Sequence, residues 1–241
     1  MHQNGRNSGF VNCTTAGRGI PPECRNPPKE PRFLLFSRGK RCHTEFMNTR
    51  ENNPSAVQID LSLPLDRELL QRFSHSSDAA LFGHVGTHFD AMDKTFPLAY
   101  TECPGVVFDV SAIRGRQIEL ADIDPGRIRA GYAVLFHTGF LEEKGYGSEA
   151  YHKNHPQLSY ALIDALLCLD IALIGIDAAG IRRGKEHTPA DQYCADHNVF
   201  VVENLCNLGS FKEKECILLH TYPMNLVGFT GIPCRVIAEK L

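Results

Sequence analysis

Five short apolar runs, separated by polar and turn-forming residues, constrain the fold of this chain more than any other feature. A run of this kind, bounded by turn residues, is typical of a buried strand. Helical patterns lie between the runs, so the sequence predicts a mixed α/β fold, although periodicity does not specify the order of strands in the sheet. The five runs are GVVFDV (105–110), YAVLFHTGF (132–140), IALIGID (171–177), VFVVENL (199–205) and CILLHTY (216–222).

Other segments complete this outline. VQIDLSL (57–63) alternates apolar and polar residues and predicts a half-buried strand, and CRVIA (234–238) predicts a last strand. A short helix is expected over residues 66–73. Ser159 is expected to cap a second helix, which carries leucines along one face at Leu158, Leu162, Leu166 and Leu169. Asp177 ends its strand and is expected to cap the following turn.

Composition excludes several classes of function. The formal net charge is −3 and the pI about 6.4, and no basic stripe indicates a nucleic-acid partner. No apolar run approaches the roughly 18 residues of a membrane span. The nine cysteines are irregularly spaced without a CxxC pair, so we expect most of them to be reduced. With no signal-peptide pattern at the N-terminus, we expect a cytoplasmic protein.

The first 55 residues differ from the rest in composition. They are rich in Gly, Asn, Arg and Pro and show no sustained period, so we expect residues 1–55 to be a flexible N-terminal extension and residues 56–241 to form one domain. Met47 looks like a natural start just before this domain. We interpret residues 1–46 as an appended leader, whose deletion should leave the fold and activity unchanged.

The segment HVGTHFDAMDKTF (84–96) carries the densest set of ligand-type side chains. Imidazole and carboxylate groups suit Zn²⁺ or Mn²⁺, and three protein ligands leave a position open for water. Gly86 and Thr87 favour a tight loop over a helix between the two histidines. His88 and Asp90 point the same way if the chain there is extended. The alternative is that His84, His88 and Asp90 are three polar residues of a surface loop.

The motifs along residues 57–241, taken in order, resemble the cyclase family of metal-dependent hydrolases, which includes bacterial kynurenine formamidase (arylformamidase) and isatin hydrolase. HVGTHFDA follows the strand DLSLPL, as it does in that family. The later motifs are similar to the family's strand ending in Thr-Gly and an aromatic, its helix start, its Gly-x-Asp strand, its glutamate strand and its closing segment. These motifs are VLFHTGF, HPQLS, IGID, VFVVENL and TGIPCRVIA.

The resemblance implies a swivelling α/β fold, a mixed β-sheet or barrel with flanking helices, and an arylformamidase-like activity. Family members hydrolyse a C–N bond in a small amide, formamide or cyclic amide and are typically oligomers, so a homodimer or higher homo-oligomer acting on a small molecule is expected. The resemblance assigns His84, His88 and Asp90 to a first divalent ion, with Zn expected and Mn as the alternative. Glu203 completes that site or bridges to a second ion, so one or two ions per chain are implied.

The chain departs from the family pattern in two places, and the first concerns a catalytic residue. The family motif usually continues to a proline and a histidine, where this chain has Met92 and Lys94. That histidine is normally assigned a catalytic role, so Lys94 becomes a candidate general acid or base with a lowered pKa, a clamp for a substrate carboxylate, or a solvated surface lysine. With the histidine replaced, Glu203, Asp191 or Lys94 must supply proton transfer.

The second departure lies about twelve residues before the glutamate, where the family carries one or two histidines and this chain has Asp191 and Gln192. Asp191 can ligate an ion directly. His187 could swing into the same space or lie in solvent. Arg182, with Arg183, follows a strand end and could pair with a substrate carboxylate, or form a solvated basic turn.

Three functions follow from these residues. The first is a metal-dependent hydrolase that acts through an activated water. The second is a metal-dependent lyase or isomerase that stabilises an enolate. The third is a non-catalytic member of the family that keeps a metal or ligand pocket. The sequence does not identify the substrate.

Overall fold

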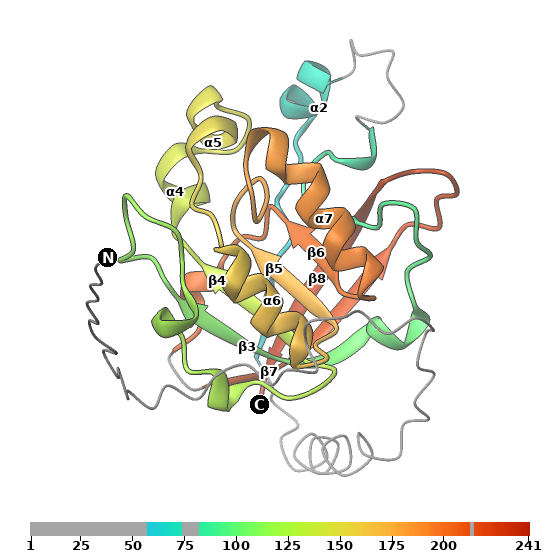
Figure 1. Ribbon diagram of the computed structural model, residues 1–241. Coiled ribbons are helices and arrows are strands. Elements are labelled where there is room, and N and C mark those ends of the chain that lie inside the picture. The colour runs from blue at the N-terminus through green and yellow to red at the C-terminus, as the bar shows by residue number, and fades with distance from the viewer. Residues whose placement is uncertain (1–56, 74–81, 213–214) are drawn as a thin grey trace, which may run out of the picture.

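The computed structural model describes residues 57–73, 82–212 and 215–241 and shows a closed barrel of seven strands with helices outside it (Figure 1). Strands β3 to β6 are parallel, whereas β2 and β7 run antiparallel to their neighbours, and the β7–β8 pairing closes the barrel. The strands are β1 (Gln58–Asp60), β2 (His88–Asp90), β3 (Glu102–Asp109), β4 (Ala133–His137), β5 (Leu173–Ile176), β6 (Phe200–Glu203), β7 (Cys216–Pro223) and β8 (Gly231–Lys240). β1 extends the sheet by pairing with β8.

Helices cover the outer face of the parallel strands (Figure 1). The α-helices are α2 (Arg67–Phe73), α4 (Phe140–Lys144), α5 (Glu149–Asn154), α6 (Tyr160–Cys168) and α7 (His187–Asp196). Single 3₁₀ turns lie at η2 (Leu98–Tyr100), η3 (Leu120–Asp122), η4 (Pro125–Arg127), η5 (Gly184–Glu186) and η6 (Leu208–Ser210). Figure 1 shows α6 and α7 over β4, β5 and β6, and α4 beside α5.

The parallel strands are buried on both faces, which explains why their sequences are continuously apolar. In β4, Val134 and Phe136 pack into the core under the helices, whereas Ala133 and Leu135 pack into the barrel interior. The α/β prediction is therefore confirmed, as are the predicted strands. The short helix expected over residues 66–73 is α2. Ser159 caps α6 as expected, because its Oγ accepts a hydrogen bond from the Leu162 amide at 3.1 Å.

Helix α7 was not expected from the sequence. Its segment begins near Gly184, contains Pro189 and is largely polar, and these features are typical of a loop. The proline is tolerated because it lies in the first turn, where its missing N–H leaves no helix bond unmade.

The structure does not test the expectations about the N-terminal segment and the oligomeric state. The expected extension over residues 1–55 and leader over residues 1–46 lie outside the described residues, and the expected homo-oligomer stays a prediction. Within the described ranges, no helix combines the length and apolar character needed to span a bilayer.

Candidate metal centre

The loop before β2 places the first ligand-type side chains. Gly86 has a φ of 70°, a conformation that glycine adopts without steric cost, and the chain turns there into β2 as the sequence predicted. Thr87 anchors the turn, since its Oγ1 donates to the Asn204 carbonyl at 2.7 Å and accepts from the Leu63 amide at 2.8 Å. His88 and Asp90 then lie on one face of the strand, two residues apart.

Strand pairing brings Glu203 to this face. In the antiparallel β2–β6 ladder His88 lies directly opposite Glu203, and His88 Nε2 is 3.5 Å from Glu203 Oε2. The other ring nitrogen of His88, Nδ1, lies 2.9 Å from the Gly86 carbonyl oxygen. A proton on Nδ1 therefore has an acceptor, which leaves Nε2 as the nitrogen available for a metal ion.

Helix α7 supplies the other side of the cluster. His187 and Asp191 lie one helical turn apart, with His187 Nε2 3.2 Å from Asp191 Oδ2 and 2.8 Å from Glu203 Oε1. Gly180 permits this approach, because a Cβ there would lie 3.0 Å from His187 Nε2 and 3.1 Å from Glu203 Oε1. Its φ of 124° is also unfavourable for any other residue.

The loop histidine His84 completes the arrangement. His84 Nδ1 lies 3.1 Å from both His88 Nε2 and Asp90 Oδ1, and His84 Nε2 lies 3.0 Å from Thr230 Oγ1. Two overlapping groups could hold an ion, each with ligand atoms within 4.8 Å of one another, and they share Asp90. Together they comprise His84, His88, Asp90, His187, Asp191 and Glu203.

Electrostatics indicate that this cluster is incomplete without a cation. Asp90 Oδ2 and Asp191 Oδ1 are buried, and neither has a hydrogen-bond partner. Burial and the negative charges of Asp90 and Glu203 raise the pKa of Asp191 well above its usual value, and burial with the Asp90 charge does the same for Glu203. Three buried carboxylates this close together repel one another.

The imidazoles compensate only part of this charge. Burial opposes the charged form of His88, but the Asp90 and Glu203 carboxylates outweigh burial and raise its pKa to about 9. The pKa of Asp90 is lowered despite its burial, because His88 and His84 stabilise the carboxylate. A divalent ion would satisfy the unpartnered oxygens and the excess negative charge, and the nitrogen and oxygen donors fit a borderline ion such as Zn²⁺ or Mn²⁺.

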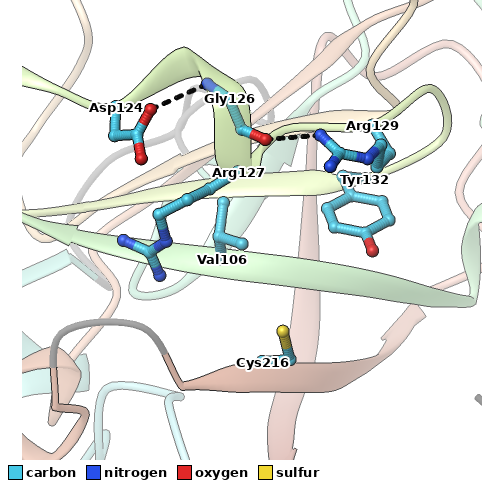
Figure 2. Close-up of a pocket in the computed structure, with 7 residues that line it drawn as sticks. All are labelled: Val106, Asp124, Gly126, Arg127, Arg129, Tyr132 and Cys216. Atoms are coloured by element: carbon cyan, nitrogen blue, oxygen red, sulfur yellow. Dashed lines mark hydrogen bonds between the residues drawn. The ribbon is translucent and has the colours of Figure 1, made fainter.

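A cavity of about 290 Å³ opens onto this cluster. It is lined by His84, Val85, His88, Tyr146, His152, Ala179, His187, Glu203 and Asn204. A second concavity of about 330 Å³ lies beside the start of β4, between the Asp124–Arg129 loop and Cys216 (Figure 2). Figure 2 shows Arg129 bonded to the Gly126 carbonyl there, and none of the metal-type clusters found among the described residues lines that concavity.

Two predicted residues are not brought to the cluster. Lys94 Nζ lies 2.7 Å from Asp196 Oδ1 and 3.0 Å from Asp93 Oδ1, and these carboxylates raise its pKa. The Lys94 pKa is therefore raised in this structure, whereas the sequence predicts a lowered pKa beside a metal ion, and the catalytic role of Lys94 stays a prediction. The lysine contacts the distal end of α7, whereas His187 lies at the start of that helix.

Arg182 also makes its contacts away from the cluster. Its guanidinium donates to the Leu158 carbonyl at 2.7 Å, pairs with Glu186 and lies over the Tyr160 ring at 4.5 Å. The side chain is buried by these contacts and does not line the cavity, so the structure gives no support to its expected contact with a substrate carboxylate. Asp177 is a cap, as expected, but it caps the turn after β4, because it accepts from the amides of Thr138 and Gly139.

Some contributors were not found from the sequence. Asn204, with a positive φ of 56°, donates from Nδ2 to the Gly86 carbonyl at 2.8 Å and accepts from the Tyr151 hydroxyl at 2.7 Å. It therefore ties the metal loop to α5. The sequence did offer one signal for Asn204, because Asn is enriched at left-handed backbone positions and this asparagine directly follows an apolar strand that ends in a glutamate.

Comparisons with known proteins agree with this architecture. Isatin hydrolase A from Ralstonia solanacearum superposes with a TM-score of 0.63 at 19% identity, over 81% of this chain and 96% of the other. A structure described as a potential metal-dependent hydrolase with cyclase activity gives a TM-score of 0.60 at 22% identity, over 78% and 99%. An isatin hydrolase bound to the product analogue thioisatinate gives 0.60 at 20% identity, over 83% and 98%.

Sequence comparison gives a more specific result. No curated protein matches the chain significantly. A family model described as "Putative cyclase" matches residues 59–182, which is more than half of the chain and includes the loop from His84 to Asp90. The matched segment also contains β3, β4 and β5, in the order that the structure shows. The chain belongs to the cyclase family.

Proposed function

We propose that this protein is a metal-dependent hydrolase that cleaves a C–N bond in a small amide, formamide or cyclic amide. The observation that carries the proposal is the cluster of three buried carboxylates and three histidines, in which Asp90 Oδ2 and Asp191 Oδ1 have no hydrogen-bond partner. Such a cluster lies at the base of a cavity, where a substrate can reach it. The fold shared with solved isatin hydrolases supports a cyclic amide as one substrate class.

The ligands of the ion are proposed to be His84, His88, Asp90 and Glu203, with Asp191 and His187 on the far side. Zn²⁺ is the expected ion and Mn²⁺ the alternative, because no thiolate belongs to the cluster among the described residues. When bound, such an ion lowers the pKa of its water towards about 7 and polarises the scissile carbonyl.

The protein itself selects and orients the substrate. The cavity volume of about 290 Å³ suits a small molecule. No lysine or arginine is among the lining residues in the part of the chain that the structure describes, so a substrate carboxylate would find no cationic side chain there apart from the ligands of the ion. Tyr146 and His152 are the aromatic rings that line the cavity outside the proposed ligand set. We therefore expect an uncharged, planar substrate to be preferred over an anionic one.

A substrate panel with controlled metal content tests the proposal. The purified protein would be stripped with chelator, reloaded with Zn²⁺ or Mn²⁺, and assayed on N-formyl anilides and cyclic amides such as isatin. Hydrolysis is expected to disappear with the metal and to return with it. A protein that elemental analysis shows to be loaded, yet that leaves every amide intact, would overturn the proposal in favour of a binding role or a different reaction.

A further inference from the structure

His152, which the sequence did not single out, lines the metal cavity from an exposed position on α5. It lies on α5 and lines the same cavity as His84, His88 and Glu203. Among the described residues its imidazole makes ring contacts only, with centroid distances of 6.3 Å to Tyr146 and 5.5 Å to Tyr151. No hydrogen bond or ion pair within the described part of the chain engages either ring nitrogen, so both are free to bond a ligand.

The helix that carries His152 is fixed relative to the cluster. Ser148 caps α5 by accepting from the Tyr151 amide at 3.0 Å. Tyr151 is fully buried and donates its hydroxyl proton to Asn204, which directly follows the ligand Glu203. One hydrogen bond thus couples α5 to the strand that supplies the glutamate, and this rigidity suits a residue that must meet a substrate at a defined distance.

Other groups that could move a proton are already engaged. Lys94 is held by two carboxylates that raise its pKa. His187, Asp191 and Glu203 contact one another within the proposed ligand set. His152 is the cavity imidazole that lies outside this set.

We propose that His152 is the proton-transfer residue of this site, an inference that rests on the proposed amide hydrolysis. The neutral imidazole takes a proton from the attacking water as the water oxygen bonds to the carbonyl carbon. The imidazolium then gives that proton to the leaving nitrogen as the C–N bond breaks and its electron pair moves to nitrogen. His152 returns to its neutral form, and hydrolysis leaves a carboxylic acid and an amine, on two molecules for an open-chain amide and on one for a cyclic amide.

The surroundings of His152 agree with a neutral resting state. His152 is exposed but not fully solvated, and this partial burial lowers its pKa, so the base form predominates at neutral pH. The titratable groups near it share its helix and its flanks or line the same cavity. They are Glu149, Lys153, His155, Tyr146, His84, His88, His187 and Glu203.

Substitution with chemical rescue tests this role. His152→Gly should lower kcat about 10²–10⁴-fold with little change in KM, and imidazole added to the solution should restore part of the rate because the cavity mouth is open. His152→Phe keeps the ring contacts and should be equally slow without responding to imidazole. Lys153→Ala, on the adjacent exposed position of α5, is the matched control and should retain the parent rate. Metal content should equal that of the parent in all three.

Clear outcomes would overturn the inference. His152→Phe with near-parental kcat would do so, as would activity lost together with the metal, or a slow His152→Gly enzyme that imidazole does not accelerate. A parent protein that hydrolyses none of the amide panel would instead overturn the proposed function.

A readout without turnover separates the two failures. Mn²⁺ bound at the cluster should broaden the imidazole NMR signals of His152, which lines the cavity, more than those of His197, which does not. Signals of His152 that stay sharp would overturn its placement in the site.

Discussion

The two halves of the candidate metal centre are built in different ways. His84, His88 and Asp90 come from seven consecutive residues, and one turn and one short strand fix their positions. His187, Asp191 and Glu203 come from a helix and a strand that meet only when α7 packs on β6. We call His84, His88 and Asp90 the loop half, which depends on local backbone geometry. His187, Asp191 and Glu203 are the helix half, which depends on tertiary packing.

The halves are alike in burial but differ in one ligand. Each has a histidine that is 34% exposed, His84 or His187, and an aspartate with one buried oxygen that has no partner. The loop half adds His88, a buried imidazole whose Nδ1 proton has the Gly86 carbonyl as acceptor. Because this imidazole is already oriented, we expect the loop half to determine whether an ion binds and the helix half to determine how strongly.

The largest expected effect follows from breaking the loop half. His88→Ala removes a ligand whose Nε2 faces three other cluster residues, so metal affinity should fall by more than about 10²-fold and hydrolysis should be lost. Elemental analysis after dialysis measures this effect, with His197→Ala as the control on a histidine outside the cluster. An unchanged metal content would refute the assignment of His88.

A smaller effect is expected in the helix half. Asp191→Asn should weaken metal binding by about 10–100-fold without abolishing it, and His187→Ala by about 10-fold or less. If the two halves share two ions, the titration of the parent should show a second, weaker step that Asp191→Asn removes. Equal losses from His88→Ala and Asp191→Asn would show that the halves contribute alike.

The thermal stability of the metal-free protein should fall with pH. The raised pKa of His88, about 9 against an ordinary 6.5, gives stability that is present below pH 6.5 and is lost as the pH rises through 9. The raised pKa values of Asp191 and Glu203 also lower the stability as the pH rises. Metal binding needs deprotonated ligands, so the loaded protein should not show this fall.

Differential scanning fluorimetry between pH 6 and 9 would measure the difference. The melting temperature of the metal-free protein should drop on the order of several degrees across this range. Parallel curves for the metal-free and loaded proteins would contradict the proposed electrostatic role of the cluster.

The smallest effect is expected at Lys94. Lys94→Arg should keep the rate within about two-fold and the melting temperature within about 2 °C, because exposed ion pairs contribute roughly 0–1 kcal/mol. Steady-state kinetics on a verified substrate would measure this. A collapse of kcat would restore Lys94 as a proton carrier and count against His152.

The same contrast explains what the sequence could predict. Buried strands have continuous apolar runs, and a ligand motif within seven residues is visible as a string, so the α/β class and His84, His88 and Asp90 were accessible. Closure of the barrel was not, since the β2–β6, β2–β8 and β3–β7 pairings join segments far apart in the chain.

Helix α7 illustrates the remaining gap. Its buried face, Ala190, Asp191, Cys194 and Ala195, has helical spacing but contains too few large apolar residues to stand out. Lys94 pairs with Asp196 at the far end of that helix, so its position could not be predicted without α7. His152 lies on a helix of only six residues, and its relation to the cavity exists only after α5 has packed.

An anomalous-scattering map from crystals grown with Mn²⁺ would locate the ion among the side chains of the cluster. We predict a strong peak about 2.0–2.2 Å from His88 Nε2 and a carboxylate oxygen of Asp90, with Glu203 also in contact, and any second, weaker peak near Asp191 and His187. A map with no peak within coordinating distance of these side chains, from crystals with verified Mn²⁺ content, would contradict it.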